Sequence, residues 1–260
     1  MSQEKPLILI TNDDGYQAEG LLALIDFVKP LGRVLVVASE SQRSGQSSAI
    51  TSNQPVRAHN VVKDEDYTLY ICSGTPVDCI KLAFDKLCDH KPDLILSGIN
   101  HGSNTSISIL YSGTMGAALE GAVYGIPAIG FSFCNVSNDA DFSHLKKYVQ
   151  TMVGRALNQG IPDEICLNVN FPVGQIKGIR ICKQAKGHWT EEFLHRKDPS
   201  GRSYYWLSGF FINKELDNEE TDEWAVANGY ISVVPCKVDL TAYEAFPILK
   251  NWTSVQKEII

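Results

Sequence analysis

The stretch Leu7-Ile-Leu-Ile-Thr-Asn-Asp-Asp-Gly15 decides the fold that this sequence predicts. Its first four residues form a continuous apolar run, which is typical of a β-strand buried on both faces. Apolar residues at helical spacing follow from Leu21 to Val28, and Pro30 ends the predicted helix. A second apolar run then spans residues 33–38. This order of strand, helix and strand predicts a parallel α/β unit.

The same alternation continues to about residue 135. Thr75-Pro-Val-Asp78 predicts a helix start, since Thr suits the N-cap, Pro the first turn, and Asp78 can complete a capping box. A sheet with helices on both faces is expected, which is a Rossmann-like, doubly wound, mainly parallel α/β fold. The further strands are expected over residues 67–72, 93–97 and 126–133, and the further helices over 75–88, 116–122 and 142–157.

The pattern changes from Ile165 onward, where strands are expected with long polar joins between them. We expect these strands over residues 167–170, 176–182, 203–207 and 230–234. The acidic join from Asn213 to Glu223 is predicted to be a solvated loop. We therefore expect a single domain over residues 1–260, with a core of about 1–185 and a β-rich C-terminal extension of about 186–260.

The composition excludes several classes of function. The chain has 260 residues, of which 23 are Lys or Arg and 30 are Asp or Glu, so its formal net charge is −7. This acidic balance argues against a binder of nucleic acid or of anionic membranes. No apolar stretch approaches 18 residues, so no membrane span is expected. The seven cysteines form no C-x-x-C pair and no signal peptide is visible, which favours a reducing, cytoplasmic location.

Polar side chains follow the predicted strands at the points where the strands end. Asp13 and Asp14 follow the first strand, Ser44 lies in the loop after the second, and Asn100 follows a later one. In open α/β sheets, ligands bind beyond the carboxyl ends of the strands. Two adjacent carboxylates repel each other unless a cation lies between them, and oxygen ligands suit Mg²⁺, Mn²⁺ or Ca²⁺. The alternative is a plain turn, because Asn-Asp-Asp-Gly is also good turn chemistry.

Tyr111-Ser-Gly-Thr114 precedes the small-residue helix. Ser112 and Thr114 can cap that helix, which is the more common outcome, or bind an anion together with free backbone amides. Gly113 would let a phosphate approach the backbone. His101 follows Asn100, and an exposed loop histidine is the plainer interpretation. Tyr204-Tyr205-Trp206 offers rings that could stack on a base, although such a cluster more often belongs to a core or a subunit contact.

Several of these motifs together resemble the SurE family of stationary-phase survival proteins, which are metal-dependent 5′/3′-nucleotidases. The resemblance covers most of the chain in the family's order, and it departs at Ser103, where the family usually has Pro after Gly. It implies one Mg²⁺ or Mn²⁺ per subunit held by Asp13, Asp14, Ser44 and Asn100. It also implies phosphate contacts from Asn12, Ser112, Gly113 and Thr114. The motifs are residues 8–15, 43–44, 73–79, 97–100, 111–114, 167–172 and 239–243.

The function implied by this resemblance is hydrolysis of nucleoside 5′-monophosphates, with 3′-monophosphates and short polyphosphate as further substrates. The catalytic set would be Asp13, Asp14, Asn100, Ser112 and Thr114. A homodimer or homotetramer built by exchange of C-terminal segments is implied too, which would give Tyr204–Trp206 a subunit role.

Alternatives remain open at this stage. A non-catalytic sensor of nucleotides or phosphometabolites would use the same pocket. A metal-dependent sugar-nucleotide transferase would also have paired aspartates. For the phosphatase, attack by an aspartate predicts a trappable phospho-aspartate, whereas attack by water predicts single inversion at a chiral phosphorothioate.

Overall fold

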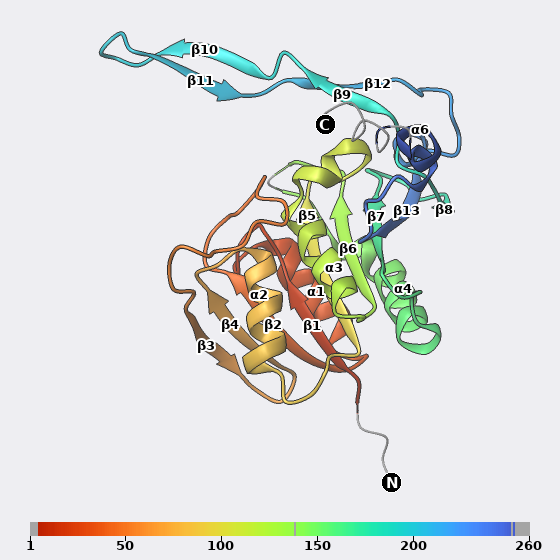
Figure 1. Ribbon diagram of the computed structural model, residues 1–260. Coiled ribbons are helices and arrows are strands. Elements are labelled where there is room, and N and C mark those ends of the chain that lie inside the picture. Colours follow the sequence, from red (N-terminus) through yellow and green to blue (C-terminus); the bar gives the residue numbers. More distant parts are fainter. Residues whose placement is uncertain (1–4, 138, 251, 253–260) are drawn as a thin grey trace, which may run out of the picture.

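The computed structural model describes residues 5–137, 139–250 and 252 of the chain. Its centre is a nine-stranded sheet of order β3-β4-β2-β1-β5-β6-β7-β13-β8 (Figure 1). The six strands from β4 to β7 run parallel, and β3 is antiparallel to β4. Strand β13 is antiparallel to β7 but parallel to β8. The bounds are β1 (Leu7–Thr11), β2 (Arg33–Ser39), β3 (Ala58–Lys63), β4 (Tyr67–Cys72), β5 (Leu94–His101), β6 (Ala128–Phe133), β7 (Ile165–Phe171), β8 (Gly178–Ile181) and β13 (Tyr230–Lys237).

The sheet is wound in two directions from β1, which pairs with β2 on one side and β5 on the other. The Rossmann-like, doubly wound fold predicted from the sequence is therefore confirmed. The topological switch point lies between β1 and β5, where ligand sites of such sheets are found. The helices are α1 (Glu19–Val28), α2 (Pro76–Leu82), α3 (Gly113–Val123), α4 (Lys146–Gln159), α5 (Asp222–Ala227) and α6 (Phe246–Leu249).

The core lies on both faces of the sheet because β1 is covered by helices on each side. Every residue of β1 is buried. Ile8 and Ile10 pack on the face that is covered by α1 and α4. Leu7 and Leu9 pack on the opposite face with residues of α2 and α3. The continuous apolar run of β1 is thus explained by two buried faces, and it fixes where Asp13 and Asp14 emerge.

The start of α2 has the local structure that its sequence predicts. The Thr75 hydroxyl accepts a hydrogen bond from the Asp78 amide at 3.1 Å, and an Asp78 carboxylate oxygen accepts one from the Thr75 amide at 2.9 Å. This reciprocal pair is a capping box, with Pro76 at the first helical position. The helix begins where expected because these contacts are local in sequence.

A long arm was only partly predicted. Strands β9 (Gly187–Thr190) and β12 (Phe210–Asn213) pair with each other, as do β10 (Phe193–Lys197) and β11 (Ser203–Leu207). We call the β9–β12 pair the arm root and the β10–β11 pair the arm tip. The arm leaves the body at the end of the sheet opposite the N-terminus (Figure 1). The strand expected over residues 203–207 is confirmed, but it lies outside the main sheet.

The prediction of a solvated acidic loop over Asn213–Glu223 is wrong at its end. Thr221 is fully buried and Asp222 is 1% exposed, and α5 begins there. The Asp222 carboxylate accepts hydrogen bonds from the amides of Ser106 and Ala185, at 2.8 and 2.9 Å. These distant backbone donors make burial of the charge possible, and no local sequence pattern reports them.

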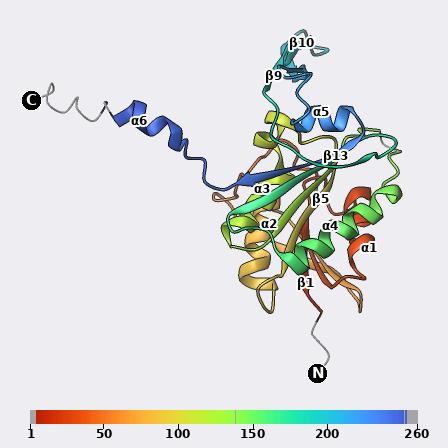
Figure 2. The same cartoon turned by 90° about the vertical axis from the view of Figure 1, so that its right-hand side faces the viewer.

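After β13 the chain leaves the body, and α6 extends away from it (Figure 2). Strand β13 pairs with β7 inside the main sheet, so the sheet takes a strand from beyond residue 186. The division into a core and a C-terminal extension stays a prediction. Within the described residues, no helix is both long enough and apolar enough to cross a membrane.

Candidate active site

A cavity of about 490 Å³ lies at the carboxyl edge of the sheet, next to the switch point. It brings together residues from segments that are far apart in sequence. Of the residues singled out in the sequence, those that line it are Asp13, Ser44, Asn100, His101 and Ser112.

Asp13 is the most deeply buried acid of the site, at 3% exposure. The Thr114 hydroxyl donates a hydrogen bond to one of its carboxylate oxygens at 2.6 Å. Burial, with a smaller contribution from the neighbouring Asp14 charge, raises the pKa of Asp13 to about 6, although the Thr114 hydrogen bond opposes this. The negative charge on Asp13 is therefore poorly solvated by the protein alone.

Asp14 faces a second cavity, of about 460 Å³, which adjoins the first. The His101 amide donates to an Asp14 carboxylate oxygen at 3.1 Å, and burial raises the pKa of Asp14 above its ordinary value. His101 lines both cavities, and its Nε2 atom is buried without a hydrogen-bond partner among the described residues. The interpretation of His101 as an exposed loop histidine is therefore wrong.

The start of α3 carries three of the expected phosphate contacts. The Ser112 hydroxyl oxygen is the N-cap and accepts from the Met115 amide at 3.1 Å, so the capping interpretation is confirmed for Ser112. The Thr114 hydroxyl is directed at Asp13 instead of the cavity. A Cβ added at Gly113 would lie 2.9 Å from both Cβ and Oδ2 of Asp13, so only glycine fits beside this carboxylate.

Asn12 and the loop after β2 complete the surroundings. The Asn12 amide nitrogen donates to the Gly15 carbonyl at 2.8 Å, while its Oδ1 atom is buried without a partner among the described residues. The Arg43 amide donates to the Asp13 carbonyl at 2.7 Å. The neighbouring Ser44 is thereby held against the cavity. Asn100 donates its amide to the Gly102 carbonyl at 2.8 Å, which fixes its orientation.

These residues fit a hard divalent cation. Two adjacent acids with raised pKa values lie at the site, and in the described part of the chain neither forms an ion pair with Lys, Arg or His. No three His, Cys, Asp or Glu side chains gather for a metal among the described residues. Any ion here would therefore rely on two carboxylates with serine and amide oxygens, a donor set that suits Mg²⁺ or Mn²⁺.

Sequence reasoning missed the far wall of the cavity. Trp189, Glu192, Leu207 and Ser208 come from the arm, and Asn104 and Ser108 come from the segment before α3. The arm residues follow Asp13 by more than 170 positions and carry no motif. Only the tertiary fold brings them to the site.

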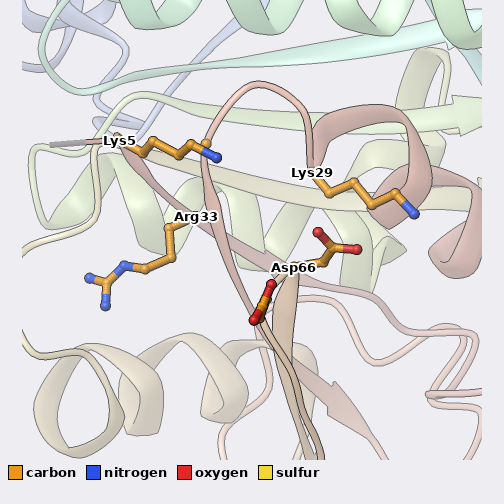
Figure 3. Close-up of a pocket in the computed structure, with 6 residues that line it drawn as sticks. Lys5, Lys29, Arg33 and Asp66 are labelled. Atoms are coloured by element: carbon orange, nitrogen blue, oxygen red, sulfur yellow. The ribbon is translucent and has the colours of Figure 1, made fainter. Parts of the chain in front are cut away.

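A smaller cavity, of about 220 Å³, lies at the opposite end of β1 and β2 and is lined by Lys5, Lys29, Arg33, Glu65 and Asp66 among others. Figure 3 shows that the Lys29 and Arg33 side chains point in opposite directions. The Arg33 guanidinium is bound to Asp89 through two hydrogen bonds of 2.7 Å each. These charges do not converge on one point, so the cavity at the carboxyl edge is the better candidate.

The fold and the site together define a doubly wound α/β protein with an acid-lined cavity at its switch point, where ligand sites of such sheets are found. The sequence model of the family described as Survival protein SurE matches residues 8–191. The chain belongs to the SurE family, as its motifs predicted.

Relatives match over nearly the full length. The chain is 49% identical to 5′-nucleotidase SurE of Bacteroides fragilis, over 97% of this chain and 99% of that protein. It is 50% identical to the protein of the same name from Flavobacterium psychrophilum, over 95% and 98% of the two chains. The crystal structure of the SurE protein from Aquifex aeolicus has a TM-score of 0.82 and 39% identity, covering 95% of this chain and 100% of that one.

Proposed function

We propose that this chain is a metal-dependent 5′-nucleotidase that hydrolyses nucleoside 5′-monophosphates to nucleoside and phosphate. The relatives that match it over nearly its whole length carry the name 5′-nucleotidase. The structural observation that carries the proposal is that Asp13, Asn100 and Ser112, from three separate segments of the chain, line one cavity. We extend the proposal to 3′-monophosphates and short polyphosphate as further substrates.

Asp13, Asp14, Ser44 and Asn100 are the ligands that we propose for one Mg²⁺ or Mn²⁺ per subunit. Their support is the poorly solvated charge on the two acids together with the neutral oxygens beside them. Such an ion, when bound, polarises a phosphoryl oxygen and offsets the charge that develops in the transition state. The Thr114 hydroxyl fixes the Asp13 carboxylate through its hydrogen bond, so we assign Thr114 to orienting that ligand.

Ser112, Gly113 and Asn12 are the groups that we propose to hold the phosphate. The first amides of α3 lack helical partners, and the N-terminus of a helix favours an anion. Because the Ser112 oxygen accepts the Met115 amide, its own proton remains for donation to a phosphoryl oxygen. Asn12 is a close neighbour in sequence of Asp13 and is held in place by Gly15. Positioning of this kind supplies much of the acceleration in phosphoryl transfer.

Two further expectations belong to the proposal. A cytoplasmic location is supported by the seven cysteines, all of which are free thiols. A homodimer or homotetramer is supported by the apolar side chains that the arm tip exposes, such as Phe193 at 65% and Trp206 at 64%. The Tyr204–Trp206 stretch keeps its proposed subunit role on the same ground.

Phosphate release from AMP under multiple-turnover conditions tests the proposal. Metal-free protein in EDTA should be silent, and Mn²⁺ or Mg²⁺ should restore turnover. A protein that binds AMP without turnover would be a sensor, and one that consumes only sugar nucleotides would be a transferase. Full activity in the chelator would reject the metal dependence, and analytical ultracentrifugation would test the oligomer.

A further inference from the structure

The residues that line the cavity at the carboxyl edge come from two parts of the molecule, the body and the arm. Asp13, Asn100 and Ser112 of the body supply carboxylate, hydroxyl and amide groups at one end. Trp189 and Leu207 of the arm supply aromatic and apolar groups at the other. A volume of about 490 Å³ is in the range of sites for whole small molecules and exceeds the space that a phosphate group occupies. The site therefore has room for the organic part of its substrate, against an aromatic wall.

Trp189 is held firmly in the arm root. It lies on β9 directly opposite Phe211 of β12, and their rings are 6.1 Å apart at an angle of 61°. Phe211 is itself fixed over Gly187, because a Cβ added at Gly187 would lie 2.1 Å from the Phe211 ring. The indole is half-buried and braced on one side by Phe211. A braced ring loses little conformational entropy when a ligand stacks on it.

The arm root is also tied to the phosphate end of the site. The Ser106 hydroxyl donates to the Ala185 carbonyl at 2.8 Å, and the Asp222 carboxylate accepts from the amides of both residues. Ala185 lies two residues before the arm root, and Ser106 begins the 3₁₀-helix η2 (Ser106–Tyr111), which leads into Ser112. The separation between the two ends of the cavity is thus set by buried hydrogen bonds.

We propose that the arm residues that line the cavity form the nucleoside subsite of the enzyme, with the indole of Trp189 in the arm root stacking on the base. This rests on the proposed function, because it assigns the second half of the same substrate. Glu192, which also lines this end, supplies a carboxylate that accepts hydrogen bonds from ribose hydroxyls. The Ser208 amide donates to the Glu192 carbonyl at 2.7 Å and fixes the backbone there. The arm root thereby makes the enzyme prefer nucleotides over smaller phosphomonoesters.

The arm tip is the competing source of an aromatic platform. Tyr204, Tyr205 and Trp206 are 40%, 64% and 64% exposed, and none of them lines the cavity. The base-stacking role considered for these three residues from the sequence therefore passes to Trp189. Trp206 supplies a matched control, since it is a tryptophan on the same arm that does not line the cavity.

The test compares AMP with methyl phosphate, which has no base or sugar. For Trp189→Ala we expect kcat/KM for AMP to fall about ten-fold through KM, the loss typical of one base–aromatic stack. The value for methyl phosphate should stay within about two-fold. Trp189→Phe should recover most of the lost kcat/KM for AMP. Trp206→Ala should leave kcat/KM unchanged for both substrates. An equal loss on both substrates, or no loss on AMP, would overturn the subsite.

A second measurement separates this inference from the proposed function. Calorimetric titration with AMP reports binding when the protein does not hydrolyse it. If the wild-type protein releases phosphate from neither substrate, the nucleotidase proposal fails, and the titration alone decides the subsite. A roughly ten-fold weaker Kd in Trp189→Ala supports it, and an unchanged Kd rejects it.

The Glu192 carboxylate has its own readout. Glu192→Ala should reduce the preference for AMP over dAMP several-fold, because the lost acceptor served the hydroxyl that dAMP lacks. Glu191→Ala, one position away and outside the cavity lining, is the control. An unchanged ratio of the two substrates would remove Glu192 from the subsite and leave Trp189 to be judged on the AMP result.

Discussion

The carboxyl edge of the sheet and the arm meet at one cavity, but they are built in different ways. At the edge, Asp13 and Asp14 follow a strand that is buried along its whole length, so their positions are dictated within a few residues of sequence. The arm root reaches the same cavity by way of Asp222, whose hydrogen-bond partners Ser106 and Ala185 are distant in the chain. We infer that the chemistry of this enzyme is encoded locally, whereas the fit to its substrate is encoded by tertiary contacts.

The largest effect is expected from removing the charge of Asp13 at the carboxyl edge of the sheet. Asp13→Asn should lower kcat/KM for AMP by at least about 100-fold, which corresponds to ~2.7 kcal/mol, since a proposed metal ligand loses its charge. The thermal midpoint of the metal-free protein should stay the same or rise, because the buried charge is poorly solvated. Activity assays and thermal melts in EDTA measure the two effects.

Asp66→Asn is the matched control for this change, since Asp66 is exposed and lines the cavity at the opposite end of the sheet. It should alter neither quantity. Near-normal turnover of Asp13→Asn would count against the assignment of the edge as the catalytic region.

Gly113 tests how tightly the edge is packed. In Gly113→Ala the new Cβ would lie 2.9 Å from the Asp13 carboxylate, so Asp13 or the start of α3 must shift. We expect a loss of about ten-fold or more in kcat/KM, because small displacements at a catalytic site are costly. Steady-state kinetics with AMP provides the measurement.

Gly154→Ala gives a control of the same chemistry. Gly154 lies within α4, and a Cβ there would meet no atom within 4 Å. Activity should be unchanged, and the free energy of unfolding should rise by about 0.5–1 kcal/mol, since alanine is the better helix former. Equal activities of the two variants would show that the packing at Gly113 has no catalytic consequence.

The parts of the fold that the sequence predicted are those that depend on local patterns, and the parts that it did not predict depend on tertiary contacts. The apolar run of β1 and the capping box at Thr75 are local patterns, and both have the predicted structure. The edge strand β3, with its mostly exposed sequence Ala-His-Asn-Val-Val-Lys, has too few apolar residues to be recognised. The burial of Asp222 was predicted wrongly because its two backbone donors come from other parts of the chain.

The candidate site divides in the same way. The sequence singled out Asp13, Ser44, Asn100 and Ser112, which the fold places around one cavity. It did not single out Trp189, since a tryptophan in a short two-stranded segment has no distinguishing pattern. The alternation of side chains along a strand would also not reveal that Trp189 lines a cavity formed mainly by the carboxyl edge of the main sheet. The roles of all these site residues stay predictions until the variants are measured.

Asp222 tests the tertiary contacts that hold the arm root against the body. Asp222→Ala should lower the free energy of unfolding by about 2 kcal/mol, because it leaves buried amides of Ser106 and Ala185 without an acceptor. Urea denaturation measures the change. Glu219→Ala in the same acidic segment is the control and should cost less than about 0.5 kcal/mol, since its contact with Arg180 is on the surface. Equal costs would mean that the buried hydrogen bonds do not stabilise the arm root.

The smallest effect is expected at Asp78, whose capping contact with Thr75 the sequence did predict. Burial raises the pKa of Asp78, but hydrogen bonds from Thr51 and Thr75 outweigh it and hold the pKa below its ordinary value of 3.8. A group with a lowered pKa in the folded state stabilises the fold above 3.8, and this contribution is lost as the pH falls through the folded-state pKa. Asp78→Asn should therefore lower the free energy of unfolding by about 1 kcal/mol at pH 7 and by progressively less below pH ~4.

Urea denaturation across this pH range measures the difference, with Asp66→Asn as the control. If the loss of unfolding free energy does not change with pH, the Asp78 charge has no part in the capping box. A loss as large as that of Asp222→Ala would contradict the distinction between local and long-range contacts.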